Sequence, residues 1–355
     1  MENVFGQFNS LPRNQLPRLS VQERESRWTA IRKKMRDEQI DCLLIHGDSG
    51  KWDQKSSNMR YVGQIGGNGE DGWLVFPLEG DPVAFIFSGG AMLNLWQELQ
   101  DWVTDVRNAP GQNWSHFIID HLKKSYMDES RIGIVGLVGY QEAEGTVSYL
   151  TMTRLQEGLP EAKFVDATRL IEDLRIYKSG EEIAFIEKAA EIGDHAIKVM
   201  RRVCQPGVPE HVAYAKIFEA LLEAGSEQPL TFFWDAGTCV NHGQRFIGRR
   251  ILEKGDVIVN EISPRYFGYW AHFQAPTAVG EAREQYQELF NIAYQSYMNA
   301  LNLLRPGLKL RDIAEAFEKP IHAAGATYAC IRSWYRWKGF GISCNSSTIQ
   351  ADRDV

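Results

Sequence analysis

The chain has 355 residues, of which 44% are hydrophobic and 24% are charged, and its formal net charge is −7. This length suffices for two domains of ordinary size, and the composition is that of a globular protein rather than a disordered one. The mild acidity argues against a nucleic-acid partner, because nucleic acids are usually held on a basic surface. There is no apolar run of about 18 residues, so we expect no membrane-spanning helix.

Residues 1–19 are polar and contain prolines, and we expect them to form an irregular arm. They lack the apolar segment of a secretory signal peptide, which predicts a cytoplasmic protein. The five cysteines are widely spaced and form no CxxC pair, a pattern that indicates buried or incidental thiols in a reducing compartment. These cysteines are Cys42, Cys204, Cys239, Cys330 and Cys344.

The first half of the chain predicts alternating helices and strands. Ser20, with Glu23 three residues later, is typical of a capping box that opens a helix over residues 21–39. A second helix is expected over residues 145–159. Short apolar runs bounded by turn residues predict strands at 40–47, 73–77, 83–87 and 132–136. We therefore expect an α/β domain over residues 20–174.

The pattern changes near residues 175–182, where Ser179 and Glu182 form another capping-box pattern. Apolar residues at helical spacing follow it, and the prolines of 205–209 end that helix because proline removes a backbone donor. The stripe consists of Ile183, Ile186, Ala190, Ile197 and Met200. Further helices are expected at about 210–224, 281–304 and 310–324, and strands at 230–234, 256–262 and 267–280. The second domain, residues 175–355, is thus predicted to place helices on a mainly antiparallel sheet.

The segment LRIYKSGEEIAFIEKAAEIGDHAI (174–197) resembles the linker and first catalytic-domain helix of the creatinase, aminopeptidase P and prolidase family. Other segments agree with that family in order and spacing. They are RWTAIRKKMRDEQIDCLLI and NMRYVGQIGG before WLVFP in the N-terminal domain, LEKGDVIVNEISPRYFGYWAHFQAPTAVG in the central hairpin, LRPGLKLRDI between two helices, and KGFGIS near the end. The resemblance implies an α/β fold: a creatinase-like N-terminal domain, then a pita-bread α+β domain that is shortened at its C-terminus.

The metallopeptidases of this family resemble one another at five ligand positions, namely two aspartates, one histidine and two glutamates. In this sequence Glu261 and His272 stand where the aspartates are expected, and Phe340 stands where the histidine is expected. The chain reaches Val355 before the segments that would carry both glutamates. Too few ligands remain to fix a two-metal site, so we expect neither a metal nor another cofactor.

Creatinase belongs to the same family, resembles this chain at Phe267-Gly268-Tyr269, and works without metal. The resemblance implies that His242, in Val-Asn-His-Gly, transfers a proton, a role that suits a side chain titrating near neutral pH. A loop histidine without a role is the alternative. Gln274 falls where creatinase keeps a substrate-binding glutamate. Glutamine keeps the hydrogen bonding but removes the charge, which argues against creatine itself as the substrate.

Strand alternation places His272 and Gln274 on one face of the hairpin. Glu261 and His272 could converge there as a carboxylate–imidazole pair that orients the ring, and an exposed ion pair is the alternative. Trp334, in an aromatic stretch near Phe340, could line the substrate pocket, although core packing would explain it as well. The predicted site thus consists of catalytic His242, Glu261 and His272, and of substrate-binding Gln274, Trp334 and Phe340.

Three functions are compatible with these residues. The first is a metal-independent hydrolase or lyase that acts on a C–N bond of a small polar substrate. The second is a noncatalytic binding or dimerisation protein, and the third is an Xaa-Pro aminopeptidase or prolidase with altered metal ligands. The resemblance also implies a homodimer with a small-molecule substrate.

Overall fold

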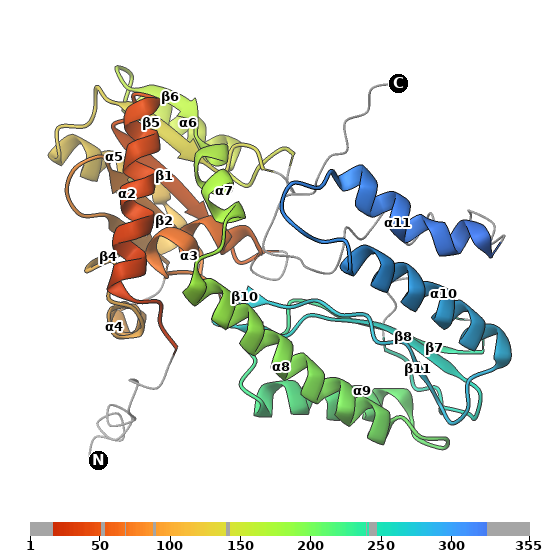
Figure 1. Ribbon diagram of the computed structural model, residues 1–355. Coiled ribbons are helices and arrows are strands. Elements are labelled where there is room, and N and C mark those ends of the chain that lie inside the picture. Colours follow the sequence, from red (N-terminus) through yellow and green to blue (C-terminus); the bar gives the residue numbers. More distant parts are fainter. Residues whose placement is uncertain are drawn as a thin grey trace, which may run out of the picture.

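Two domains lie side by side, with the long helix α8 leading from one into the other (Figure 1). The structure, a computed structural model, describes residues 17–50, 54–67, 69–87, 90–139, 143–238, 240 and 247–324. Among the residues it describes, no helix is both long and apolar enough to cross a bilayer.

The N-terminal domain is built on one mixed six-stranded sheet in the order β4-β3-β2-β1-β5-β6. Strand β2 is antiparallel to both β1 and β3, and the remaining neighbours are parallel. The strands are β1 Cys42–Gly47, β2 Gly72–Pro77, β3 Val83–Ile86, β4 Asp105–Asn108, β5 Arg131–Val135 and β6 Lys163–Asp166. The helices are α2 Val21–Asp37, α3 Ser57–Gly63, α4 Gly90–Leu99, α5 Trp114–Lys124, α6 Tyr149–Gly158 and α7 Thr168–Ile176. The predicted α/β domain is confirmed.

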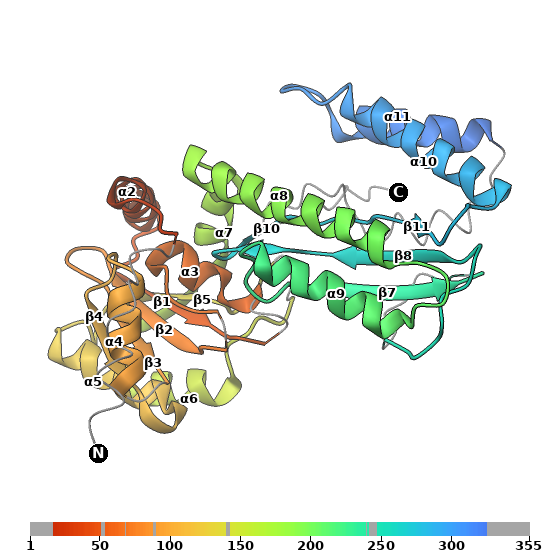
Figure 2. The ribbon, with the colours of Figure 1, turned by 90° about the horizontal axis from the view of Figure 1, so that it is seen from below.

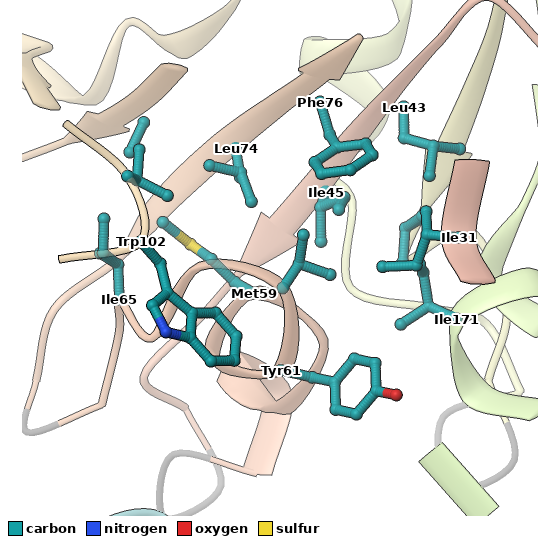
Figure 3. Close-up of a cluster of buried hydrophobic side chains, with 14 of the residues drawn as sticks. Ile31, Leu43, Ile45, Met59, Tyr61, Ile65, Leu74, Phe76, Trp102 and Ile171 are labelled. Carbon is teal, nitrogen blue, oxygen red and sulfur yellow. The ribbon is translucent and has the colours of Figure 1, made fainter. Parts of the chain in front are cut away.

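Both faces of this sheet are buried, which explains why its central strands are continuous apolar runs. Leu43 and Ile45 of β1 join the core beneath α2, α3 and α7, whereas Cys42 and Leu44 point into the core beneath α5 and α6. Figure 3 shows the first of these cores. Its labelled members are Ile31, Leu43, Ile45, Met59, Tyr61, Ile65, Leu74, Phe76, Trp102 and Ile171.

The predicted capping box at Ser20 is half correct. The Ser20 hydroxyl accepts a hydrogen bond from the backbone N–H of Glu23 at 3.1 Å, so Ser20 is the N-cap of α2. The Glu23 carboxylate does not return to the Ser20 backbone but binds Arg27 at 2.7 Å. Instead, the Ser20 N–H donates to Glu181 of the second domain at 2.8 Å. A long-range contact has therefore replaced the local one.

The C-terminal domain packs helices on a three-stranded antiparallel sheet in the order β11-β8-β7, as predicted. Its strands are β7 Phe232–Gly237, β8 Val257–Ile262, β9 Arg265–Tyr266, β10 Tyr269–Trp270 and β11 Thr277–Ala278. Its helices are α8 Gly180–Val203, α9 Glu210–Glu223, α10 Glu284–Leu301 and α11 Leu310–Ala323. Helices α8 and α9 lie on one side of β7, β8 and β11, and α10 and α11 lie on the other (Figures 1 and 2).

The strand predicted over 267–280 is interrupted. It consists of β10, one isolated bridge at Phe273, and β11. Pro276 lacks a backbone N–H, so the ladder cannot continue through it. The buried amide of Asn260 fills the gap, because it accepts from Ala275 N at 3.2 Å and donates to Ala275 O at 2.8 Å. The hairpin between β9 and β10 turns at Phe267 and Gly268, both with positive φ, the geometry of the tightest β-hairpins.

The capping box of α8 is confirmed, because the Ser179 hydroxyl and Glu182 carboxylate each accept from the other residue's backbone N–H, at 3.2 and 2.9 Å. The predicted apolar stripe is wrong at Ile183, which is exposed. In the first turn of α8 the buried side chain is instead that of Glu182, which contacts Arg27 and Tyr269. Sequence periodicity gave the helix correctly but misplaced its buried face at the domain junction.

Partly buried His46 predicts an acid-labile N-terminal domain. Its ring lies 4.7 Å from that of Trp73, and Nδ1 is 3.0 Å from the Thr146 hydroxyl. Burial lowers the pKa of His46 to about 4. In the unfolded chain His46 is therefore protonated below about pH 6.5, whereas in the folded chain it becomes protonated only near pH 4. This contribution to stability is complete above pH 6.5 and is lost as the pH falls to 4.

We expect His46 to account for about 3 kcal/mol of the stability lost between pH 7 and pH 4. Urea unfolding of the wild type and of His46→Gln at several pH values measures it, since glutamine does not titrate. The pH profile of the variant should be flatter by that amount. His322→Gln, which removes an exposed histidine from the other domain, is the control. Parallel profiles for the wild type and His46→Gln would contradict the prediction.

Candidate active site

The sheet of the C-terminal domain has one apolar and one polar face. Trp234 of β7, Ile258 and Ile262 of β8, and Phe273 pack into the core formed with α8 and α9. Phe273 presses so closely on Gly193 of α8 that a Cβ there would lie 1.8 Å from the ring. Because side chains alternate along a strand, their sequence neighbours face the opposite side, toward α10 and α11 in Figure 1.

The hairpin register brings three predicted residues onto that second face. Ile262 and Phe273 exchange both backbone hydrogen bonds, at 3.0 and 2.9 Å, so Glu261 lies opposite Gln274 and Ser263 lies opposite His272. The Gln274 amide donates to the Glu261 carboxylate over 3.4 Å. Glu261 and His272 are thus diagonal neighbours. The carboxylate–imidazole pair considered from the sequence does not form between them, because the register places Gln274 opposite Glu261 and Ser263 opposite His272.

His272 is held by neutral groups and by burial. Its Nδ1 lies 2.7 Å from the Ser263 hydroxyl, which is itself 2.6 Å from the Thr231 hydroxyl, and its ring meets that of Trp270 edge-on at 6.0 Å. Burial lowers the pKa of His272 below the usual value, so the imidazole is neutral at pH 7. The contact with Ser263 uses Nδ1 and leaves Nε2 of His272 outside it. This nitrogen can accept or deliver a proton.

Asp235 on β7 belongs to the same face and was missed from the sequence. Phe233 pairs with Glu261 and Asp235 pairs with Val259, so the Asp235 and Glu261 carboxylates lie on one face of adjacent strands. Asp235 and Glu261 are each 7% exposed. The predicted strand ended at Trp234, which left Asp235 in a loop, whereas β7 continues to Gly237. An acid in an otherwise apolar strand was the available signal, because acids are rarely buried without a role.

The other predicted site residues, His242, Trp334 and Phe340, lie outside the described residues. The same is true of Cys239, Cys330 and Cys344. Cys42 and Cys204 are buried free thiols, and burial raises the pKa of each to about 12, which makes them poor nucleophiles. The functional roles of the site residues, seen or unseen, remain predictions.

The described donors do not by themselves fit a two-metal centre. Within the described part of the chain, no three His, Cys, Asp or Glu side chains come close enough to hold a metal ion. Glu261 and His272 occupy the hairpin positions where the resemblance leads one to expect aspartates, but they stand diagonally and each contacts a neutral partner. Two carboxylate-bridged ions need more oxygen ligands than this pair supplies.

Comparison with known proteins finds the same domain pair. Residues 27–177 match the creatinase/prolidase N-terminal domain, and residues 184–345 match metallopeptidase family M24. An Xaa-Pro dipeptidase of Pyrococcus furiosus is 27% identical over 176 residues, which are 48% of this chain and 49% of that protein. A creatinase of a Bacillus species is 26% identical over 168 residues, 45% of this chain and 41% of the relative. The matched part is thus half or less of each of these two proteins.

The crystal structure of the prolidase from Pyrococcus horikoshii OT3 superimposes with a TM-score of 0.67 at 20% identity, and the alignment covers 84% of this chain and 78% of that one. A likeness at this identity shows the fold. The two domain matches follow each other in order, so the chain consists of a creatinase/prolidase N-terminal domain followed by a metallopeptidase family M24 domain.

Proposed function

We propose that the protein hydrolyses the C–N bond of an Xaa-Pro dipeptide or of a similarly short peptide. The observation that carries this proposal is the placement of a buried carboxylate, Glu261, and a neutral imidazole, His272, on one face of the M24-type sheet. The matched Xaa-Pro dipeptidase and the prolidase fold favour a peptide over a guanidino compound. This choice replaces the creatinase-like reaction as the leading hypothesis.

Amide hydrolysis needs one group that takes a proton from water and one that returns a proton to the leaving nitrogen. His272 suits proton transfer, because burial keeps it neutral and Nε2 is directed away from its Ser263 contact. Glu261 suits the orientation of water or of the substrate amine, and the Gln274 amide fixes its carboxylate. Asp235 adds a second negative charge on the same face, which favours a substrate with a cationic amino terminus.

Metal-independent cleavage of a C–N bond in another small polar molecule is the second candidate. It is favoured by the imidazole of His272 at a hairpin position where an oxygen ligand is expected, and by its engagement with Ser263. In that case a histidine transfers protons where a metallopeptidase would bind a cation. A noncatalytic descendant of the family is the remaining alternative.

A substrate panel separates these functions. Purified protein is offered Gly-Pro, Ala-Pro, a longer Xaa-Pro peptide, creatine and simple amidino compounds, in chelator and after addition of Mn²⁺. We expect turnover of the dipeptides above the other compounds. Dipeptide turnover that is unchanged by chelator would identify the metal-independent mechanism, and turnover of amidino compounds alone would reject the peptidase. A folded protein that is inactive on the whole panel in both conditions would support the noncatalytic alternative.

The family resemblance also leads us to propose a homodimer in the cytoplasm. Sedimentation equilibrium should then give twice the chain mass of 40.4 kDa. A mass of one chain at micromolar concentration would contradict the proposed dimer.

A further inference from the structure

A pocket at the junction of the two domains has an unusually cationic lining. Arg60 and Gln64 come from the N-terminal domain, Arg175 from the last turn of α7, Lys178 from the segment between α7 and α8, and Arg265 from β9. Glu182 is the acidic side chain of the lining, and it is already engaged by Arg27 at 3.4 Å and by the Tyr269 hydroxyl at 2.9 Å. Four positive side chains therefore line the pocket, whereas its acidic side chain, Glu182, already contacts Arg27 and Tyr269.

Arg175 differs from the other two arginines of the pocket, because it has no acidic ion-pair partner among the described residues. Arg60 and Arg265 both form ion pairs with Glu227, at 3.3 and 3.2 Å. Arg175 donates to the neutral Asn58 amide oxygen at 2.6 Å, and no carboxylate of the described residues forms an ion pair with it. Burial lowers the pKa of Arg175, which shows that the neighbouring acids do not offset its desolvation. A bound anion would supply the missing charge.

Gln64 offers an independent sign of a ligand. This side chain is 5% exposed and lines the pocket. Its Oε1 accepts from the backbone N–H of Leu19 at 3.1 Å, which fixes the orientation of the amide. Its Nε2 is buried and has no acceptor among the described residues. Buried donors are almost always satisfied, so an acceptor is expected at this position.

We propose that the junction pocket binds a compact oxyanion, a carboxylate or a phosphate group, between Arg175 and the Gln64 amide. Planar guanidinium groups suit oxyanions, because two parallel N–H groups meet two oxygens. The ligand contacts both domains and so strengthens their docking. Trp270 lines the pocket and also packs on His272, which places the oxyanion next to the candidate active site without using any residue assigned a role in hydrolysis.

Titration calorimetry and thermal unfolding test the proposal. Inorganic phosphate and succinate are added at constant ionic strength, with chloride as the compensating salt, and the tighter of the two identifies the source of the oxyanion. We expect saturable binding and a rising Tm for at least one of them. Arg175→Gln should weaken that binding by at least tenfold. Arg36→Gln, which removes an exposed arginine of α2 paired with Glu79, should leave it unchanged.

Lys178→Gln is the second variant, since Lys178 lines the same pocket and lies outside the helices. It should weaken binding severalfold while the protein remains folded. Absence of saturable binding by both ligands, or equal binding by the wild type and both variants, would overturn the proposal. Glu261→Gln should still bind the oxyanion, so failure of the proposed hydrolase and failure of this site give different results.

Discussion

Arg27→Met should lower the free energy of unfolding by about 3–5 kcal/mol, because it removes the shared partner of two buried acids. Arg27 is 3% exposed and binds Glu23 at 2.7 Å, Glu182 at 3.4 Å and the Tyr269 hydroxyl at 3.0 Å. Its guanidinium also lies 4.1 Å from the centre of the Tyr61 ring. Burial acts to lower the pKa of Arg27, but Tyr269 and Glu182 raise it above the usual value. The cation is therefore permanent.

Methionine fills the space of the arginine stem but leaves Glu23 and Glu182 buried without their cation. Urea unfolding measures the loss, and limited proteolysis at the exposed Tyr177 between the domains should become faster. Arg36→Met on the same helix is the matched control, because its ion pair with Glu79 is exposed and worth at most about 1 kcal/mol. The triple variant Glu23→Gln/Arg27→Met/Glu182→Gln should recover part of the loss. Equal effects of the two arginine variants would contradict a buried network.

Glu261→Gln should reduce kcat/KM for the best dipeptide substrate by about 10²–10⁴-fold if the proposed function is correct. The substitution keeps the shape and the contact with Gln274 but removes the charge and the capacity to accept a proton. His272→Gln should cause a loss of the same order and should remove the acid limb of the pH profile. That limb is expected below pH 6.5, because burial lowers the pKa of His272.

The matched control is Glu281→Gln in the same domain, where the carboxylate is exposed beside Lys254. It should retain the wild-type rate within about a factor of two, as expected for an exposed ion pair. Circular dichroism and thermal unfolding verify that each variant is folded. If Glu261→Gln retains the activity of the Glu281→Gln control, the polar face of the sheet is not where the reaction occurs.

The sequence alone was sufficient for the fold class, for the family resemblance and for the elements with strong local signals. Helix α8 illustrates why: Ser179 and Glu182 cap its start, and the prolines that follow Cys204 prevent its continuation. Such signals act over three or four residues, so they can be recognised without the rest of the molecule. Strands β1, β2, β3 and β5 of the first domain were also recognised, since burial on both faces makes them continuous apolar runs. Strands β4 and β6 were missed, because they are only partly buried and lack such a run. The ordered motifs around Lys178-Ser179 and Gly268-Tyr269 then identified the family.

Only the tertiary structure decided which polar residues meet. The hairpin register places Glu261 opposite Gln274 and His272 opposite Ser263. The extension of β7 to Gly237 places Asp235 on the same face as Glu261. At the junction, Arg27 reaches Tyr269 across 242 positions of the sequence. Capping and periodicity are local properties of the backbone, whereas register and domain docking depend on the simultaneous packing of distant segments. No short window of the sequence contains that information.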